Sequence, residues 1–266
     1  TNTSDSRGQP GSDVGAFTNL GNALIVQFAG HDTTGHTLSF IAFELARRPD
    51  IQSRLQDEVD ACWARLGGRD VEYSDFKTLP FMTRVITETL RLWCAVPQGT
   101  FRRLQFDDYI TVGGKRVSVP KGTQVQIQNW SRHRSTELWG ADANDFNPDR
   151  DFQDRELWHD QGFAAYNPHT DRFSPFTHPP RDCIGKNFAQ MEMRVILLHL
   201  MKTFSFRPAP QLQKWLAEKG SLASTEMGIN LGTMGPRDVS RPETVAYFQG
   251  AAKPPFGLPL FAEPRL

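Results

Sequence analysis

Cys183 is the residue of this chain whose neighbours point most clearly to chemistry. It lies in the stretch Phe176-Thr-His-Pro-Pro-Arg181-Asp-Cys183-Ile-Gly185, directly before an apolar helical pattern. A lone cysteine is more often a small buried apolar residue than a ligand. Here, however, a helix N-terminus follows the sulfur, Gly185 lets a flat ligand approach, and Arg181 offers paired donors to a carboxylate. These surroundings predict a thiolate that binds a metal ion.

A second candidate site is the stretch Ala29-Gly30-His-Asp32-Thr33-Thr, which lies inside a helical pattern from about Phe17 to Arg47. Glycine in a helix interior costs about 1 kcal/mol relative to alanine, and Asp and Thr are weak helix formers. Local choices that oppose stability often mark function. The structural alternative is a solvated kink, in which the hydroxyls bond to the preceding turn.

The Cys183 stretch resembles the haem-ligand loop of the cytochrome P450 family, F-x-x-G-x-R-x-C-x-G. Phe176, Arg181, Cys183 and Gly185 match this motif, whereas Pro179 stands where the family has glycine. Proline has a fixed φ and no N–H, so we expect this loop to follow a different path or to be stiffer. The resemblance implies that Cys183 is the axial ligand of a haem iron.

The upstream stretch is similar to the distal-helix motif of the same family. The resemblance implies that Gly30 opens room beside the haem, that Asp32 delivers protons, and that the Thr33 hydroxyl assists the activation of dioxygen. Since the two motifs are independent of each other, their joint presence argues against the kink interpretation of the second one.

Three further residues resemble the buried structural triad of the family: Glu88 and Arg91 in an E-x-x-R pattern, and Arg150 in a later segment. The resemblance implies that they support the fold and take no part in catalysis. Of the adjacent residues Arg102 and Arg103, we expect Arg103 to anchor a haem propionate. The alternative is a solvated pair of charges.

The elements that must position these residues indicate a mainly α fold with small β-sheets (α+β), which would be a partial cytochrome P450 fold. Alternation around Gly113-Gly114 predicts a hairpin. A helix with one apolar face should follow Cys183, and irregular strands should follow Pro208. The apolar face comprises Ile184, Phe188, Met191, Val195 and Leu198.

Length and composition suggest how the chain is divided. We expect a flexible lead-in at 1–15, the C-terminal haem-binding part of a P450 domain at 16–239, and a Pro-rich tail at 240–266. The 266 residues are fewer than the family usually has, so the chain is expected to be a fragment. The membrane attachment of a parent chain is then unknown.

Charge and cysteine content exclude several classes of protein. Thirty basic residues balance thirty acidic ones, which argues against a nucleic-acid partner. Three cysteines exclude a disulfide scaffold and fit a reducing intracellular compartment. No apolar stretch approaches the roughly 20 residues that span a bilayer.

The function implied by the resemblance is haem-thiolate monooxygenation, in which one oxygen atom of O2 enters a small apolar organic substrate. No flavin or nicotinamide fingerprint is present, so electrons should come from an NADPH-dependent reductase or a ferredoxin. Two alternatives within the family remain, a non-catalytic haem-binding fragment and a P450 that rearranges peroxides. A hydrolase with His31, Asp32 and His36 as metal ligands is a weaker possibility, since no H-E-x-x-H motif occurs.

Overall fold

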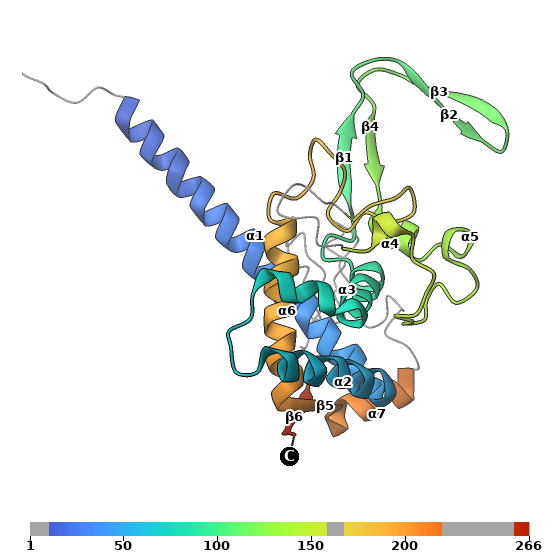
Figure 1. Cartoon of the computed structure of the whole chain (residues 1–266). Helices are drawn as coiled ribbons and strands as arrows, with labels where there is room; N and C mark the ends of the chain where they lie inside the picture. The colour runs from blue at the N-terminus through green and yellow to red at the C-terminus, as the bar shows by residue number, and fades with distance from the viewer. Residues whose placement is uncertain (1–10, 159–167, 220–257, 266) are drawn as a thin grey trace, which may run out of the picture.

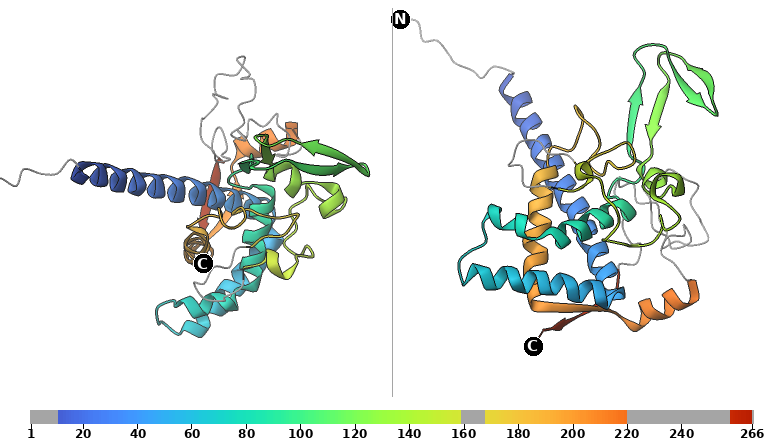
Figure 2. Two further views of the ribbon diagram at one scale, coloured as in Figure 1. Left: turned by 90° about the horizontal axis from the view of Figure 1, so that it is seen from above. Right: turned by 45° about the vertical axis from the view of Figure 1, so that its right-hand side comes forward.

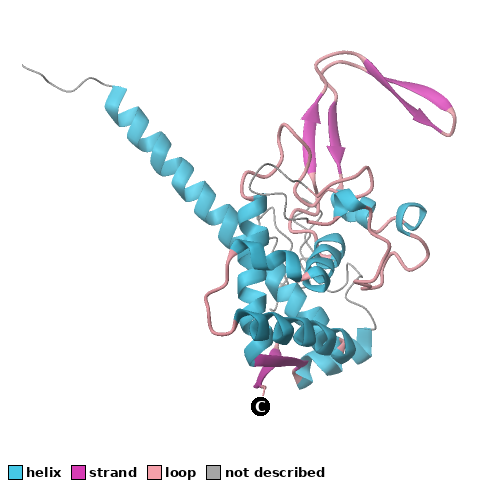
Figure 3. Cartoon of the chain, viewed as in Figure 1, coloured by secondary structure: helices cyan, strands magenta, loops and turns pink. Residues whose placement is uncertain are grey.

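The computed structural model of the chain describes residues 11–158, 168–219 and 258–265. It is rich in helices, with small two-stranded sheets at opposite ends of the molecule, which confirms the predicted fold class (Figures 1 and 3). The helices are α1 (Gly11–Arg47), α2 (Pro49–Leu66), η1 (Tyr73–Thr78), α3 (Pro80–Leu92), α4 (Asn129–His133), α5 (Thr136–Trp139), η2 (Asp154–Glu156), α6 (Lys186–Thr203) and α7 (Pro210–Lys219). The strands are β1 (Thr100–Arg103), β2 (Asp108–Val112), β3 (Lys115–Val119), β4 (Gln124–Ile127), β5 (Phe204–Pro208) and β6 (Leu260–Pro264).

The described strands form three antiparallel pairs, β1 with β4, β2 with β3, and β5 with β6. The predicted hairpin is confirmed, because β2 and β3 pair across Gly113 and Gly114, whose φ angles are 55° and 77°. Positive φ at both turn residues matches the twist of the flanking strands. Residues 260–264 of the predicted tail form β6, whereas residues 240–257 lie outside the described part.

Helix α1 is longer than the sequence predicts. It ends at Arg47 as expected, and Pro49 opens α2, but it begins at Gly11, so that residues 11–15 of the predicted lead-in are helical. Extending an existing helix by one residue costs little once the first turn has formed. Residues 1–10 lie outside the described part. In Figures 1 and 2 the first half of α1 projects from the body of the molecule.

The core forms where the second half of α1 meets α2, α3 and α6. Trp93, which follows α3, stacks on Phe40 of α1 with ring centroids 4.8 Å apart, and its indole N–H donates to the buried Glu44 carboxylate at 2.7 Å. Apolar side chains from these helices fill the centre, among them Ile41, Leu45, Leu55, Val59, Val85, Ile86, Met193 and Leu197. None of the described helices meets the length and hydropathy needed to cross a bilayer.

The start of α3 is held by a residue from another helix. Glu58 of α2 accepts hydrogen bonds from the backbone N–H groups of Phe81 and Met82 at 2.7 and 2.8 Å. The residue before the helix, Leu79, has no side chain that could make such a bond. The free N–H groups at the start of α3 therefore find their acceptor in α2.

The helix after Cys183 exists, and its predicted apolar face is only partly covered by the described part of the chain. Leu198 is buried, whereas Ile184 and Phe188 expose 96% and 65% of their surface. The buried face of α6 turns toward α2 and includes Met193, Leu197 and Met201. Sequence spacing shows which residues share a face of a helix, but the neighbouring elements decide which face is covered.

The expectation of irregular strands after Pro208 is wrong for residues 210–219. These residues form the helix α7, which begins with Pro210 in a position where the missing N–H costs nothing. The first glycine after Pro208 is Gly220, which lies outside the described residues.

Candidate functional site

The loop before α6, residues 168–185 and here called the Cys183 loop, places Cys183 at the surface. The backbone N–H of Cys183 donates to the Phe176 carbonyl at 2.9 Å, which closes the loop on itself. The Gly185 backbone N–H donates to the sulfur, and a Cβ added at Gly185 would lie 4.0 Å from it. Figures 1 and 2 place this loop and the start of α6 beside the middle of α1.

The expected thiolate is not favoured by the chain alone. Cys183 is exposed as a residue, yet the packing around its sulfur desolvates the thiol and raises its pKa above the ordinary value. The Gly185 N–H and the Lys186 ammonium lower this pKa, but by less than desolvation raises it, and the Asp182 carboxylate adds to the rise. A bound metal ion removes the proton of a coordinating thiol. The thiolate is therefore expected only with the metal.

The loop has one unusual backbone conformation, at Thr177. Its φ of 66° is the one positive value found among the described residues other than glycine, and it lies two positions before Pro179. The Thr177 hydroxyl donates to the Arg181 carbonyl at 2.8 Å. A left-handed conformation costs an L-residue roughly 1–2 kcal/mol. The loop thus stores strain directly before the candidate ligand.

Replacing Thr177 separates this strain from the hydroxyl contact. Thr177→Ala and Thr177→Gly both remove the hydrogen bond, but only glycine adopts positive φ without strain. We expect Thr177→Gly to be more stable than Thr177→Ala by about 1 kcal/mol, measured by urea unfolding of the two variants. A Thr177→Gly variant that is less stable than Thr177→Ala would show that position 177 is not strained.

The distal residues Gly30, Asp32 and Thr33 lie on one continuous helix, α1. Apart from its chain neighbours and the nearby backbone of α1, no atom of the described residues comes within 4 Å of a Cβ built on Gly30, so the glycine leaves space beside the helix. The Asp32 carboxylate lies 3.5 Å from Nδ1 of His36. The Thr33 hydroxyl donates to the Ala29 carbonyl at 2.7 Å, which is the contact that the structural alternative predicts. Its oxygen can still accept a proton donor.

Glu88, Arg91 and Arg150 are brought together in the core. The Arg91 guanidinium makes a paired contact with the Glu88 carboxylate, with both N···O distances at 2.7 Å, and neither side chain is accessible. Arg150 Nε lies 3.4 Å from Glu88 Oε1. Arg91 also donates to the carbonyls of His133 and Ala143. The three residues therefore join α3 to the segment after α4.

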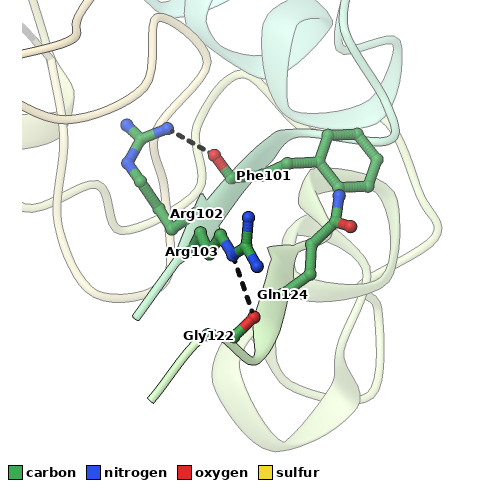
Figure 4. Close-up of a pocket in the computed structure, with 5 residues that line it drawn as sticks. All are labelled: Phe101, Arg102, Arg103, Gly122 and Gln124. Atoms are coloured by element: carbon green, nitrogen blue, oxygen red, sulfur yellow. Dashed lines mark hydrogen bonds between the residues drawn. The ribbon is translucent and has the colours of Figure 1, made fainter. Parts of the chain in front are cut away.

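Arg102 and Arg103 point to opposite sides of β1 (Figure 4). Arg103 is exposed, and its Nε donates to the Gly122 carbonyl at 3.2 Å. Arg102 is half-buried, and its charge acts on His178 of the Cys183 loop. A surface cavity of about 530 Å³ is lined by both arginines together with Phe101, Gly122 and Gln124. Alternation along the strand therefore favours Arg102, not Arg103, as the residue that faces the loop.

These residues fit a haem group. The sulfur of Cys183 can bind the iron, and apolar Ile184 and Phe188 beside it are exposed. The Arg181 guanidinium is exposed and has no side-chain partner in the described part of the chain, while Arg102 bonds only to the Phe101 carbonyl. Guanidinium groups without an acidic partner suit the carboxylates of a haem.

A protein-built metal cluster is not found in the described ranges, where no three His, Cys, Asp or Glu side chains are placed to hold an ion. His31, Asp32 and His36 all lie in these ranges, so the weaker hydrolase alternative is wrong as a three-ligand site. Of the two histidines, His36 is the one that contacts the Asp32 carboxylate.

Sequence reasoning missed the residues that hold the Cys183 loop from outside. Glu156 is fully buried and accepts bonds from Thr170 and from Arg172, at 2.6 and 2.7 Å. Residues of α4, which include Arg132 and His133, contact the loop at Ser174. Charged and polar residues in such short segments are usually solvated, and no pattern in the sequence shows that these ones are buried.

The comparisons with known proteins agree with this geometry. Residues 18–231 match the family described as Cytochrome P450. A putative cytochrome P450 CYP13A5 of Caenorhabditis elegans is 31% identical over 212 residues, which cover 80% of this chain and 38% of that protein. Cytochrome P450 3A9 of Rattus norvegicus is 34% identical and covers 85% of the chain and 41% of its own length. Cytokinin hydroxylase of Arabidopsis thaliana is 38% identical over 67% of the chain and 31% of its own length.

The solved structures agree as well. The crystal structure of a cytochrome P450 (CYP102L1) superposes with a TM-score of 0.54 at 32% identity, covering 67% of this chain and 37% of that one. The chain thus spans about two fifths or less of the length of these relatives. Since the family match covers most of the residues, the chain belongs to the cytochrome P450 family.

Proposed function

We propose that the chain is the haem-binding part of a haem-thiolate monooxygenase that inserts one oxygen atom of O2 into a small organic substrate. Members of the family bind haem. The observation that carries the proposal is the place of Cys183, an exposed residue just before α6 whose sulfur accepts a hydrogen bond from Gly185. When bound, the haem would supply the chemistry that activates dioxygen.

The chain's own residues would seat the haem. Cys183 would hold the iron, and the Gly185 N–H would limit the negative charge on the sulfur. Arg181 and Arg102 would neutralise the two propionates. Glu88 and Arg91 are buried away from solvent, so they would support this seat without touching the haem.

Proton delivery is proposed for Asp32 and Thr33. Asp32 would exchange its proton through its neighbour His36, which lies one helical turn further along α1. The Thr33 hydroxyl donates to the Ala29 carbonyl, so its oxygen would accept a hydrogen bond from the oxygen-binding side. The presence of this acid and alcohol argues against a P450 that rearranges peroxides.

We also propose the partners and the compartment. The electrons would come from an NADPH-dependent reductase or a ferredoxin. A reducing intracellular compartment is supported by Cys62, Cys94 and Cys183, which are all free thiols. The name of the Arabidopsis relative, cytokinin hydroxylase, supports hydroxylation as the reaction class.

The ligand assignment is tested by the spectrum of the haem-loaded, reduced chain with carbon monoxide. The parent should show the strongly red-shifted Soret band of a thiolate-ligated haem, and Cys183→His should show the band of a nitrogen-ligated haem. Cys62→Ser removes a buried thiol elsewhere and should leave the band in place. An unchanged spectrum in Cys183→His would refute the assignment.

Haem binding without turnover is the second candidate, because the chain spans only 31–41% of the length of the relatives named above. Consumption of reducing equivalents with a reductase or ferredoxin would separate the two. Haem binding without any consumption would favour the second candidate.

A further inference from the structure

Side chains of helix α4 form hydrogen bonds with one buried residue of the Cys183 loop, Ser174. The Ser174 backbone N–H donates to Nε2 of His133 at 3.1 Å. The Ser174 hydroxyl accepts a bond from Arg132 and lies 3.4 Å from Oδ1 of Asn129. Asn129, Arg132 and His133 are three and four residues apart, so they lie on one face of α4. That face is turned to the loop.

The chemistry of these three residues suits a fixed contact. His133 is fully buried, and burial lowers the pKa of its imidazole well below the ordinary value, with Arg132 and Arg91 adding to the effect. The imidazole is therefore neutral, which allows Nε2 to accept the Ser174 N–H. Its ring also packs on Phe173 at 5.1 Å between centroids.

The Arg132 guanidinium donates two further hydrogen bonds. It donates to Oδ1 of Asn129 at 2.9 Å and to the Asp171 carbonyl at 3.3 Å. Its guanidinium has no carboxylate partner within the described ranges. On the loop, this cation therefore binds neutral acceptors, namely the Asp171 carbonyl and the Ser174 hydroxyl.

A short, stiff path leads from Ser174 to the sulfur ligand. Pro175 follows Ser174 and has a fixed φ, and Phe176 comes next. The Phe176 carbonyl accepts the backbone N–H of Cys183 at 2.9 Å. Any displacement of Ser174 is therefore passed to Cys183 through a proline and one hydrogen bond, with little room for the chain to absorb it.

We infer that Asn129, Arg132 and His133 are positioning residues, which hold Ser174 and thereby set the place of the Cys183 sulfur for the metal. The inference rests on the proposed function, in which Cys183 is the ligand of the haem iron. None of the three belongs to the motifs that revealed the family.

The test removes the hydroxyl that α4 holds. Ser174→Ala should weaken the binding of added haem about tenfold, as the loss of groups that orient a metal ligand commonly does. Ser174→Thr keeps the hydroxyl and should restore affinity. Ser131→Ala is the matched control, because Ser131 also lies on α4 and its hydroxyl donates to Gln128 at 2.9 Å, away from the loop. It should bind haem like the parent.

A second measurement uses the chain without haem. Amide hydrogen exchange at Cys183 should quicken in Ser174→Ala and stay unchanged in Ser131→Ala, while the core helices keep their protection. A general role in stability would instead raise exchange throughout the chain. If Ser174→Ala does not fold, Arg132→Lys replaces it, because an ammonium cannot reach all three acceptors.

The outcomes separate this inference from the proposed function. Parent-like haem affinity and parent-like exchange at Cys183 in Ser174→Ala would overturn the positioning role, whatever the spectrum of Cys183→His shows. Faster exchange at Cys183, combined with an unchanged spectrum in Cys183→His, would uphold the mechanical coupling and refute the ligand assignment.

Discussion

Arg91→Gln is expected to lower the free energy of unfolding by roughly 3–5 kcal/mol, the usual cost of leaving a buried charge without its partner. Arg91 and Glu88 have no accessible side-chain surface, and two N···O contacts of 2.7 Å join them. The substitution leaves the Glu88 carboxylate with Arg150 at 3.4 Å as its one charged partner among the described residues, beside the Asn147 backbone N–H at 2.9 Å. Chemical denaturation of the haem-free chain, followed by circular dichroism, measures the change.

The chain contains its own control for this experiment. Glu44 and Arg47 repeat the E-x-x-R spacing on α1, but their N···O distance is 3.9 Å and the Arg47 side chain is 27% exposed. Arg47→Gln should therefore cost less than about 1 kcal/mol. Similar losses in Arg91→Gln and Arg47→Gln would show that burial does not set the strength of these pairs.

Arg194→Met should have the opposite sign and raise the free energy of unfolding by about 2 kcal/mol. Arg194 is fully buried on α6 and has no acidic partner in the described part of the chain. Burial lowers the pKa of its guanidinium to about 9, which shows that the charged form is destabilised there. Methionine keeps much of the volume without the charge.

The contacts that Arg194→Met removes are replaceable. Arg194 donates to the Gln190 carbonyl at 2.8 Å and to the Thr83 hydroxyl at 3.0 Å, and it lies 4.2 Å above the ring of Trp158. The Thr83 hydroxyl has its own acceptor in the Leu79 carbonyl at 3.1 Å. Thermal melts of the parent, Arg194→Met and Arg194→Gln decide the sign. A lower melting temperature for Arg194→Met would mean that these contacts outweigh desolvation.

Local features of the fold could be predicted because local chemistry fixes them. Pro49 ends one helix and begins the next, and Gly113-Gly114 allows a tight hairpin turn. The Cys183 and Gly30 motifs can be recognised because their residue types and spacing match the family's motifs. Their roles as ligand and proton donor remain predictions, which the spectra described above can test.

What the sequence does not show depends on neighbours that are distant along the chain. The exposure of Phe188 depends on what packs against α6, which helical spacing does not reveal. Arg102 and Arg103 differ by one position, and only the pairing of β1 with β4 fixes which of them faces the Cys183 loop. The thiol pKa of Cys183 depends on desolvation, which requires a folded loop.

The contact of Glu58 with the start of α3 has a consequence for how the molecule opens. If α2 and α3 separate, the N–H groups of Phe81 and Met82 lose their acceptor, the Glu58 carboxylate. The carboxylate also becomes solvated, so the burial that raises its pKa is lost. The two helices therefore share one unit of local unfolding. Since α3 carries Glu88 and Arg91, a substitution that loosens α2 also exposes this buried ion pair, although neither Glu88 nor Arg91 is itself changed.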